Sequence, residues 1–217
     1  MTTSFYFLVF QLFVLIFSVI IHEVAHGAVA FRLGDTTARD AGRLTLNPVK
    51  HLDFFGSFLL PVSLYFLSGG SLTLGWAKPV PYNPMRLSNP KVGGGLIAIA
   101  GPLSNFCIAI FFGFIIRVFS FSLAATTSVY ISELLFLFNV IVFTNVVLGI
   151  FNLLPFPPLD GSKVLFAVLP NGFEELQYFL NRYGFFILIF FIFFGFQFIT
   201  PLIDFVYRLI VGSAGIF

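Results

Sequence analysis

Charged residues are scarce in this chain of 217 residues: only 9% are Asp, Glu, Lys or Arg, whereas 59% are hydrophobic and the mean hydropathy is +1.03. So apolar a composition excludes an ordinary soluble domain and is typical of an integral membrane protein. The formal net charge of +2 is too small to indicate a nucleic-acid partner. The single cysteine, Cys107, excludes an intramolecular disulfide, and we expect its thiol to be buried because it lies in an apolar run.

The N-terminus lacks the basic stretch and the small-residue cleavage site of a signal peptide. We therefore expect it to begin a helix that is retained in the protein. Polar segments long enough to form a second, soluble domain are also lacking. Residues 1–217 are accordingly predicted to form a single membrane-embedded domain.

Long apolar runs are what the chain has instead. Runs of about 20 residues predict helices that cross a bilayer. We expect an all-α polytopic membrane protein in which four helices span the membrane. The predicted spans are residues 5–31, 92–116, 134–154 and 183–200.

A weaker apolar run, residues 54–74, is interrupted by Gly56, Pro61 and the pair Gly69–Gly70. Basic residues concentrate in three of the four polar connections, which the positive-inside rule places on the cytoplasmic side. That arrangement requires residues 54–74 to enter and leave by the same face, as a re-entrant hairpin, and the N-terminus then lies outside. A fifth full span with ordinary kinks is the alternative.

Two further segments have weaker signals. Residues 201–217 carry Asp204 and Arg208 four positions apart, which predicts an interfacial helix with one ion pair. Apolar residues alternate in GRLTL, so a short β-like segment is predicted near residues 42–48. An extended substrate can add to the edge of such a strand by β-augmentation.

The stretch VIIHEVAHGAVAF, residues 19–31, places two histidines and a glutamate in an apolar run, where each is energetically expensive. His22 and His26 share one helix face, and Glu23 is turned by about 100° from His22. This is the HExxH arrangement of zinc hydrolases, with two metal ligands and a general base for bound water. Ordinary hydrogen bonding of the three side chains to neighbouring helices is the alternative.

A catalytic zinc ion needs a third protein ligand. Glu133, Asp160 and Asp204 are the acidic residues within or beside the spans. Asp160 stands out because it follows the stretch NLLPFPPL, whose three prolines cannot continue a regular helix. It reaches the face of the membrane where His22 lies only if residues 54–74 turn back, so the metal site and the hairpin favour each other.

These residues together resemble the site-2 protease family, the intramembrane zinc metalloproteases of peptidase family M50. HEVAHG resembles the zinc helix of that family, AGPLSNF its GxxxN motif, and NLLPFPPLDG the motif that supplies the third ligand. GRLTLNPVKHLD and GWAKPVPYNP resemble connecting segments of compact bacterial members without PDZ or CBS domains. The resemblance implies that His22, His26 and Asp160 bind one zinc ion and that Glu23 is the general base.

Two asparagines are further candidates. Asn105 either hydrogen-bonds the substrate backbone or the oxyanion, or joins two closely packed helices together with Gly101. Asn152 either orients the substrate or caps broken backbone. His51 and Asp53 are assigned to an ordinary interfacial loop, with an indirect role at the metal site as the alternative.

The sequence therefore predicts a zinc-dependent endopeptidase that cuts transmembrane segments of single-span membrane proteins near the cytoplasmic side of a bilayer. By the resemblance, the membrane is the bacterial inner membrane, and the task is regulated intramembrane proteolysis or clearance of signal-peptide remnants. A zinc-binding scaffold or transporter without proteolytic activity is the alternative, and a membrane hydrolase for another amide is a third. No oligomeric state is predicted.

Overall fold

The computed structural model describes residues 2–51, 78–122 and 129–212, together with residues 53, 55, 59, 63 and 66. Helices account for most of this part of the chain. In chain order the helices are α1 (Thr2–Arg32), α2 (Thr37–Asp40), the 3₁₀ helices η1 (Pro48–Lys50) and η3 (Pro84–Arg86), α4 (Pro90–Ser122), α5 (Val129–Asn152), α6 (Asp160–Val168), α7 (Glu174–Phe190), the π-helical η4 (Phe191–Gly195) and α8 (Phe196–Val211).

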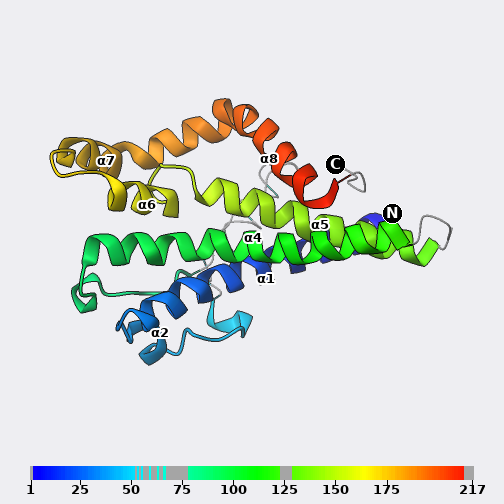
Figure 1. The fold of residues 1–217 in the computed structure, drawn as a ribbon, viewed down its shortest axis with the longest axis horizontal. Coiled ribbons are helices and arrows are strands. Elements are labelled where there is room, and N and C mark those ends of the chain that lie inside the picture. Colours follow the sequence, from blue (N-terminus) through cyan, green and yellow to red (C-terminus); the bar gives the residue numbers. More distant parts are fainter. Residues whose placement is uncertain are drawn as a thin grey trace.

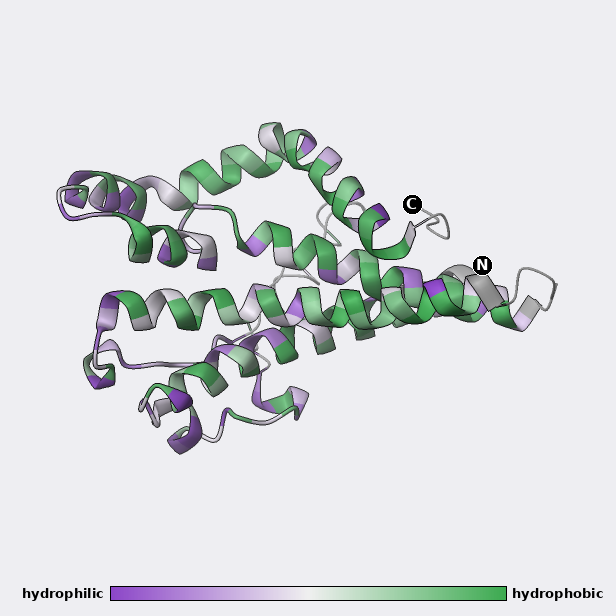
Figure 2. Cartoon of the chain, viewed as in Figure 1, coloured by the Kyte–Doolittle hydropathy of each residue, from purple (hydrophilic) through white to green (hydrophobic). Residues whose placement is uncertain are grey.

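Four helical stretches of the described residues are long and apolar enough to cross a membrane. They are Val9–Arg32, Pro90–Ser120, Tyr130–Asn152 and Glu174–Val211. Figure 2 shows apolar residues along the length of these helices and hydrophilic residues gathered at the ends and connections. The four predicted spans are confirmed as helices of this kind, and the fourth is longer than predicted.

Helix α4 is the centre of the bundle, and α1, α5, α6 and α8 all pack against it. In Figure 1, α1 and α4 run antiparallel, and α5 returns alongside α4. Ala30 near the end of α1 shares a buried cluster with Leu87, just before α4, and with Ile97 near the start of α4. The connection between α1 and α4 therefore begins and ends at the same end of the bundle.

This arrangement is what a re-entrant hairpin requires of the helices that flank it. The hairpin predicted at residues 54–74 lies outside the described residues, apart from positions 55, 59, 63 and 66. It therefore stays a prediction.

A second buried cluster joins α4, α5 and α8, and it contains Ile116, Val142, Val146 and Tyr207. The hydroxyl of Tyr207 donates a hydrogen bond to the side chain of Asn139 inside this cluster. Cys107 is exposed on α4. The expectation of a buried thiol is wrong, because α4 packs its neighbours along particular faces and Cys107 lies on an uncovered one.

The fourth span differs most from the prediction. The helix begins at Glu174, passes through η4 and continues to Val211, and Figure 1 shows α7 and α8 running in different directions on either side of η4. Pro201 lies inside α8, so the helix continues through the residue at which a span was predicted to give way to an interfacial helix. The ion pair between Asp204 and Arg208 is present, at 2.8 Å; the interfacial position of this segment stays a prediction.

Residues 42–48 form turns and bends rather than a strand, so the predicted β-like segment is wrong. Gly42 has a φ of +63°, and the Arg43 N–H donates back to the Ala38 carbonyl at 2.9 Å. The side chain of Asn47 accepts from Val49 N–H and caps η1. Because short-range turns organise this loop, it offers no strand edge to which a substrate can add.

A buried carboxylate, Asp35, fastens the end of α1 to the segment before α4. It accepts hydrogen bonds from the backbone N–H groups of Thr37 at 3.0 Å and Asn83 at 2.6 Å, and Arg86 lies 3.9 Å away. Burial alone raises the pKa of Asp35, but these hydrogen bonds and the nearby guanidinium outweigh it, so the pKa lies below its usual value. This anchor holds residues 78–83 across the end of α1.

Candidate metal centre

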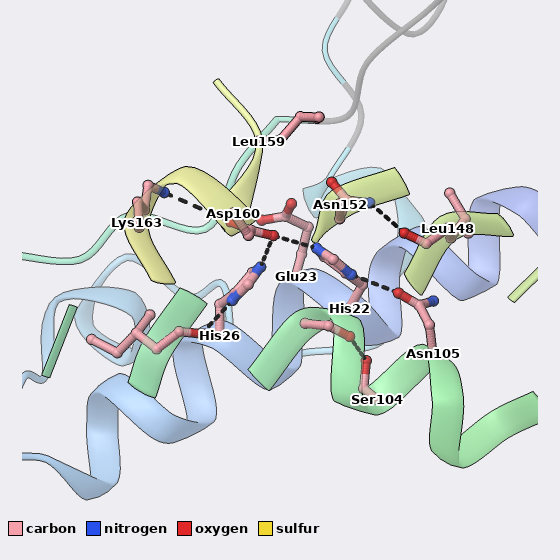
Figure 3. A network of polar contacts seen from close by, with 12 residues as sticks. His22, Glu23, His26, Ser104, Asn105, Leu148, Asn152, Leu159, Asp160 and Lys163 are labelled. Carbon is pink, nitrogen blue, oxygen red and sulfur yellow. Dashed lines mark hydrogen bonds and ion pairs between the residues drawn. The ribbon is translucent and has the colours of Figure 1, made fainter. Parts of the chain in front are cut away.

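Two histidines of α1 and one aspartate of α6 point at a common position (Figure 3). His22 and His26 lie one helical turn apart, and the centroids of their rings are 4.6 Å apart. Both residues are buried, with exposed fractions of 6% for His22 and 8% for His26. The Nε2 atoms of both rings lie 3.0 Å from Oδ2 of Asp160. Asp160 lies 138 positions from His22 and 134 positions from His26 in the sequence, and the fold brings its carboxylate to both rings.

The outer nitrogens of the two rings are held by acceptors. The Nδ1–H group of His26 donates to the Ile97 carbonyl at 2.6 Å, and that of His22 donates to Oδ1 of Asn105 at 2.7 Å. A neutral imidazole protonated at Nδ1 has its lone pair at Nε2. Both lone pairs therefore face the Asp160 carboxylate, as in metal-binding histidines oriented by an outer hydrogen bond.

This donor set fits a metal ion such as zinc. Oδ2 of Asp160 lies 3.0 Å from each Nε2 atom, and acceptor atoms at this distance repel one another unless a proton or a cation lies between them. Ligand atoms at the usual zinc distances of about 2.0–2.1 Å in a tetrahedral site are about 3.3 Å apart, close to the spacing here. Two nitrogens and one carboxylate oxygen also form a usual catalytic zinc set.

Gly101 of α4 leaves space beside the same atoms. A Cβ atom at this position would lie 2.4 Å from Nε2 of His26 and 2.5 Å from Nε2 of His22. No side chain fits there, so the glycine lets α4 approach α1 without covering the inward nitrogens. The space beside the two Nε2 atoms is a second feature that fits a bound ion.

The carboxylate of Glu23 lies beside this point. A carboxylate oxygen of Glu23 and one nitrogen of each histidine all lie within 4.8 Å of one another. Its Oε2 accepts a hydrogen bond from the Val80 N–H at 2.8 Å, which restrains the side chain. Glu23 and Asp160 are both near the histidines, and we take Asp160 as the ligand because its oxygen contacts both Nε2 atoms at 3.0 Å.

Asp160 is positioned by the non-helical connection between α5 and α6. Gly161 packs so tightly that a Cβ atom would lie 2.1 Å from the Leu153 carbonyl oxygen and 2.4 Å from that of Leu154. Asp160 is the first residue of α6, and Ser162 donates to the Leu159 carbonyl at 2.7 Å in that first turn. The close packing of Gly161 on the end of α5 therefore aims the carboxylate at α1.

A cavity of about 170 Å³ opens onto the three candidate ligands and Glu23. Its other walls come from the segment before α4, the start of α4, the end of α5 and α6. Those residues are Pro79, Val80, Tyr82, Ile97, Ala98, Asn152, Pro158 and Lys163. The ammonium group of Lys163 lies 3.8 Å from Oδ1 of Asp160 and 5.7 Å from the centre of the Tyr82 ring.

The two candidate asparagines lie in different places. Asn152 lines the cavity, and its amide nitrogen donates to the Leu148 carbonyl at 2.9 Å. Asn105 is fully buried behind His22, and its side chain bonds to His22 and Asn145 rather than lining the cavity. These contacts join α1, α4 and α5, as the interhelical alternative requires, and a contact of Asn105 with an oxyanion stays a prediction.

The loop residue His51 is buried, and its Nε2–H group donates to the Thr45 carbonyl at 2.8 Å. It does not line the cavity. Sequence reasoning missed Lys163, the Val80 contact and Asn145. The spacing gave a signal for two of them, since Lys163 follows Asp160 by three residues in a helix and Asn145 precedes Asn152 by two helical turns.

Comparisons with known proteins agree with one another. A model described as "Peptidase family M50" matches residues 10–191. The chain is 38% identical over 192 residues to "Putative zinc metalloprotease YwhC" of Bacillus subtilis (strain 168), covering 87% of this chain and 79% of that protein.

Two other relatives are longer than the chain. "Putative zinc metalloprotease Rip2" of Mycolicibacterium smegmatis is 30% identical over 68% of this chain and 52% of that protein. "Zinc metalloprotease MJ0392" of Methanocaldococcus jannaschii is 29% identical over 76% of this chain and 36% of that protein. No solved structure matches the chain. With four apolar helices and a family model that covers most of its length, the chain is an integral membrane protein and belongs to peptidase family M50, the site-2 protease family.

Proposed function

We propose that this protein is a zinc-dependent endopeptidase that cleaves transmembrane segments of other membrane proteins. The observation that carries the proposal is the convergence of His22, His26 and Asp160 at the end of a membrane-spanning helix, with Glu23 beside them. The family and the names of three relatives support zinc as the metal and proteolysis as the activity.

In this proposal His22, His26 and Asp160 hold one zinc ion. When bound, the ion supplies Lewis-acid chemistry, because zinc lowers the pKa of water and polarises a carbonyl group. Glu23 accepts a proton from the attacking water at its carboxylate and delivers it to the nitrogen of the leaving amine. The hydrogen bond from Val80 keeps the Glu23 carboxylate beside the reaction centre during both transfers.

One wall of the cavity limits the backbone hydrogen bonds that an unwound peptide can make there. The N–H group of Val80 is already bonded to Glu23, and Pro79 and Pro81 have no N–H group. A substrate strand therefore finds few backbone donors on this wall. Lys163 places a positive charge at the cavity, where it stabilises negative charge on the carbonyl oxygen or on the new carboxylate.

The position of the site supports a membrane-embedded substrate. His22 and His26 lie in the last turns of a span, so a transmembrane segment that unwinds near its end reaches them without leaving the bilayer. Basic residues are frequent in the connections at this end of the bundle, and by the positive-inside rule they support an active site on the cytoplasmic side and an N-terminus outside. The substrates in this proposal are single-span proteins of the bacterial cell membrane.

The test uses purified protein in lipid nanodiscs and a panel of single-span substrates. Glu23→Gln keeps the shape of the side chain but removes the proton acceptor. We expect this variant to bind one equivalent of zinc and to cleave about 10²- to 10⁴-fold more slowly. Glu133→Gln is the matched control, because Glu133 is an exposed carboxylate near the distant start of α5.

Two results contradict the proposal. Cleavage by Glu23→Gln at the wild-type rate removes the general-base role. Zinc binding that survives replacement of His22 or Asp160 by alanine removes the metal site. If Glu23→Gln is inactive as expected, the same variant in membranes captures uncleaved substrates for identification by mass spectrometry.

A further inference from the structure

A chain of buried polar side chains connects the metal centre to helix α5. Asn105 and Asn145 are 0% exposed and Ser18 is 4% exposed, and they come from α4, α5 and α1. The amide nitrogen of Asn105 donates to Oδ1 of Asn145 at 3.0 Å and more weakly, at 3.5 Å, to the backbone carbonyl of Ser18, so Asn145 supplies the shorter of its two hydrogen bonds. The amide nitrogen of Asn145 donates to Oγ of Ser18 at 2.9 Å and to the Ile141 carbonyl at 2.9 Å.

These hydrogen bonds have a direction. The oxygen of Asn105 accepts from His22 Nδ1–H, so the nitrogen of Asn105 faces Asn145 and needs an acceptor there. Asn145 presents its oxygen to Asn105 because its own nitrogen is directed at Ser18 and Ile141. If the amide of Asn105 turned over, its nitrogen would face His22 and its oxygen would face Asn145 Oδ1, an unfavourable pair of acceptors.

The two histidine rings are therefore oriented by different kinds of hydrogen-bond partner, a backbone carbonyl for His26 and a side-chain amide for His22. His26 bonds to a backbone carbonyl, which can only accept, so this partner alone fixes the proton at Nδ1. His22 bonds to a side-chain amide, which presents either a donor or an acceptor according to its rotation. The contact of Asn105 with His22 defines a tautomer only if something else fixes the orientation of that amide.

We propose that Asn145 is a positioning residue for the metal centre. By accepting from Asn105 it fixes the orientation of that amide, and the amide in turn keeps the proton of His22 on Nδ1 and the lone pair of Nε2 directed at the metal. This inference rests on the proposed metal site. It assigns a role in metal binding to a residue of α5 that touches neither the ion nor the cavity.

The chain offers a matched control on the same helix. Asn139 lies on α5, is 1% exposed, donates to the Leu135 carbonyl at 2.8 Å and accepts from the Tyr207 hydroxyl. It is about as buried as Asn145 and its side chain makes two hydrogen bonds where that of Asn145 makes three, but its partner outside α5 belongs to α8. A role in stability alone predicts similar behaviour of the two asparagines, whereas the proposal predicts different effects on metal binding.

The experiment measures zinc affinity by competition with a chelator, using the full-length protein in detergent, and thermal unfolding of the zinc-free protein. We expect Asn145→Leu to weaken zinc binding by about tenfold, as is usual when an outer partner of a metal-binding histidine is lost. Asn139→Leu should leave the affinity within about twofold of wild type. Both variants should lower the unfolding temperature.

A double-mutant cycle tests the route of the effect. If Asn145 acts through Asn105, then Asn105→Leu with Asn145→Leu binds zinc no more weakly than Asn105→Leu alone. Additive losses contradict the proposal, and so do equal affinities of Asn145→Leu and wild type. If Asn145→Leu does not fold, Asn145→Ala decides the question, because it removes the acceptor of Asn105 without adding volume; an affinity equal to wild type then refutes the proposal.

Failure of the proposed function looks different. If the wild-type protein binds no zinc, or binds it without His22, the metal site itself is wrong and the positioning role falls with it. If the wild type binds zinc through His22 but Asn145→Leu binds it equally well, only the positioning role is refuted. Zinc binding that depends on Asn145 in a protein that cleaves nothing refutes the protease and leaves the positioning role intact.

Discussion

Replacement of Gly101 by alanine is the most direct test of the packing around the metal centre. The added methyl group would lie 2.4 Å from Nε2 of His26, 2.5 Å from Nε2 of His22 and 2.5 Å from Cε1 of His26. These distances are about 1 Å shorter than ordinary contacts between non-bonded heavy atoms. Either the histidine rings or α4 must therefore move.

Neither side of this contact moves easily. The rings are held from behind by hydrogen bonds of 2.6 and 2.7 Å to Ile97 and Asn105. Helix α4 packs on α1, α5, α6 and α8, so a shift of its backbone disturbs several interfaces. Overpacking of this kind costs about 1–3 kcal/mol of stability, of which the better helix propensity of alanine offsets up to about 1 kcal/mol.

The effect on function should be larger than the effect on stability. Metal–ligand distances tolerate changes of about 0.2 Å, so a displacement of about 1 Å removes at least one histidine from the coordination sphere. We expect zinc affinity and the cleavage rate each to fall by about 100-fold or more. Chelator competition, peptide cleavage and thermal unfolding of the zinc-free protein measure the three quantities separately.

Gly113→Ala is the matched control on the same helix. Its Cβ atom would lie 2.2 Å from a methyl group of Ile210, so the crowding is similar, but the position is about 18 Å farther along α4. We expect a loss of stability of about 1–3 kcal/mol without a change in zinc affinity. If Gly101→Ala binds zinc as tightly as wild type, the two Nε2 atoms do not share an ion in the space beside this glycine.

Two further predictions concern the ends of α5 and α1. Gly161→Ala should abolish zinc binding and lower the free energy of unfolding by about 3 kcal/mol or more, because its Cβ atom would lie 2.1 Å from the backbone of Leu153. Chelator competition and thermal unfolding measure the two effects. Gly94→Ala is the control, and it should change neither quantity because the nearest contact of its Cβ atom is 3.9 Å. Asp35→Asn should lower the unfolding temperature at pH 7, where the carboxylate with its lowered pKa contributes fully. The difference from wild type should shrink as the pH falls below the usual value of 3.8, and a difference independent of pH would contradict the assignment.

The sequence predicted the parts of this structure that depend on local patterns. Apolar runs of about 20 residues indicated four spans because burial of backbone polar groups in a bilayer leaves a helix as the stable local structure. The HExxH spacing indicated that His22 and His26 share a face. The unwound, proline-rich stretch before Asp160 indicated a carboxylate aimed at the bundle, and the structure brings that carboxylate to both histidines.

The failures have identifiable causes. Residues 42–48 alternate like a strand, but a strand needs a partner, and turns at Gly42 and Asn47 organise the loop instead. Pro201 looked like the start of a new helix. A helix in a bilayer nevertheless keeps the hydrogen bonds on either side of a proline, because the freed groups have no water to accept them, and α8 continues through it.

Other features depend on contacts between helices and have no local pattern. Gly101 reads in the sequence as a small residue for helix packing, and only the structure places it against the inward nitrogens of His22 and His26. The pairing of Asn105 with Asn145 joins residues 40 positions apart on different helices. Likewise, the hydrogen bond from the Val80 N–H to Glu23 joins residues 57 positions apart, in a segment that also bonds to Asp35 through the Asn83 N–H.

Close packing at two glycines explains how the long helix α1 and the short helix α6 bring the candidate ligands together in so apolar a chain. Gly101 brings α4 against the histidines, and Gly161 brings the start of α6 against the end of α5. Each contact excludes solvent from one side of the ligands while the cavity beside Glu23 stays open on the other. The candidate ligands are thus shielded where they need orientation and accessible from the cavity, which is the division that the proposed hydrolysis of a peptide bond requires.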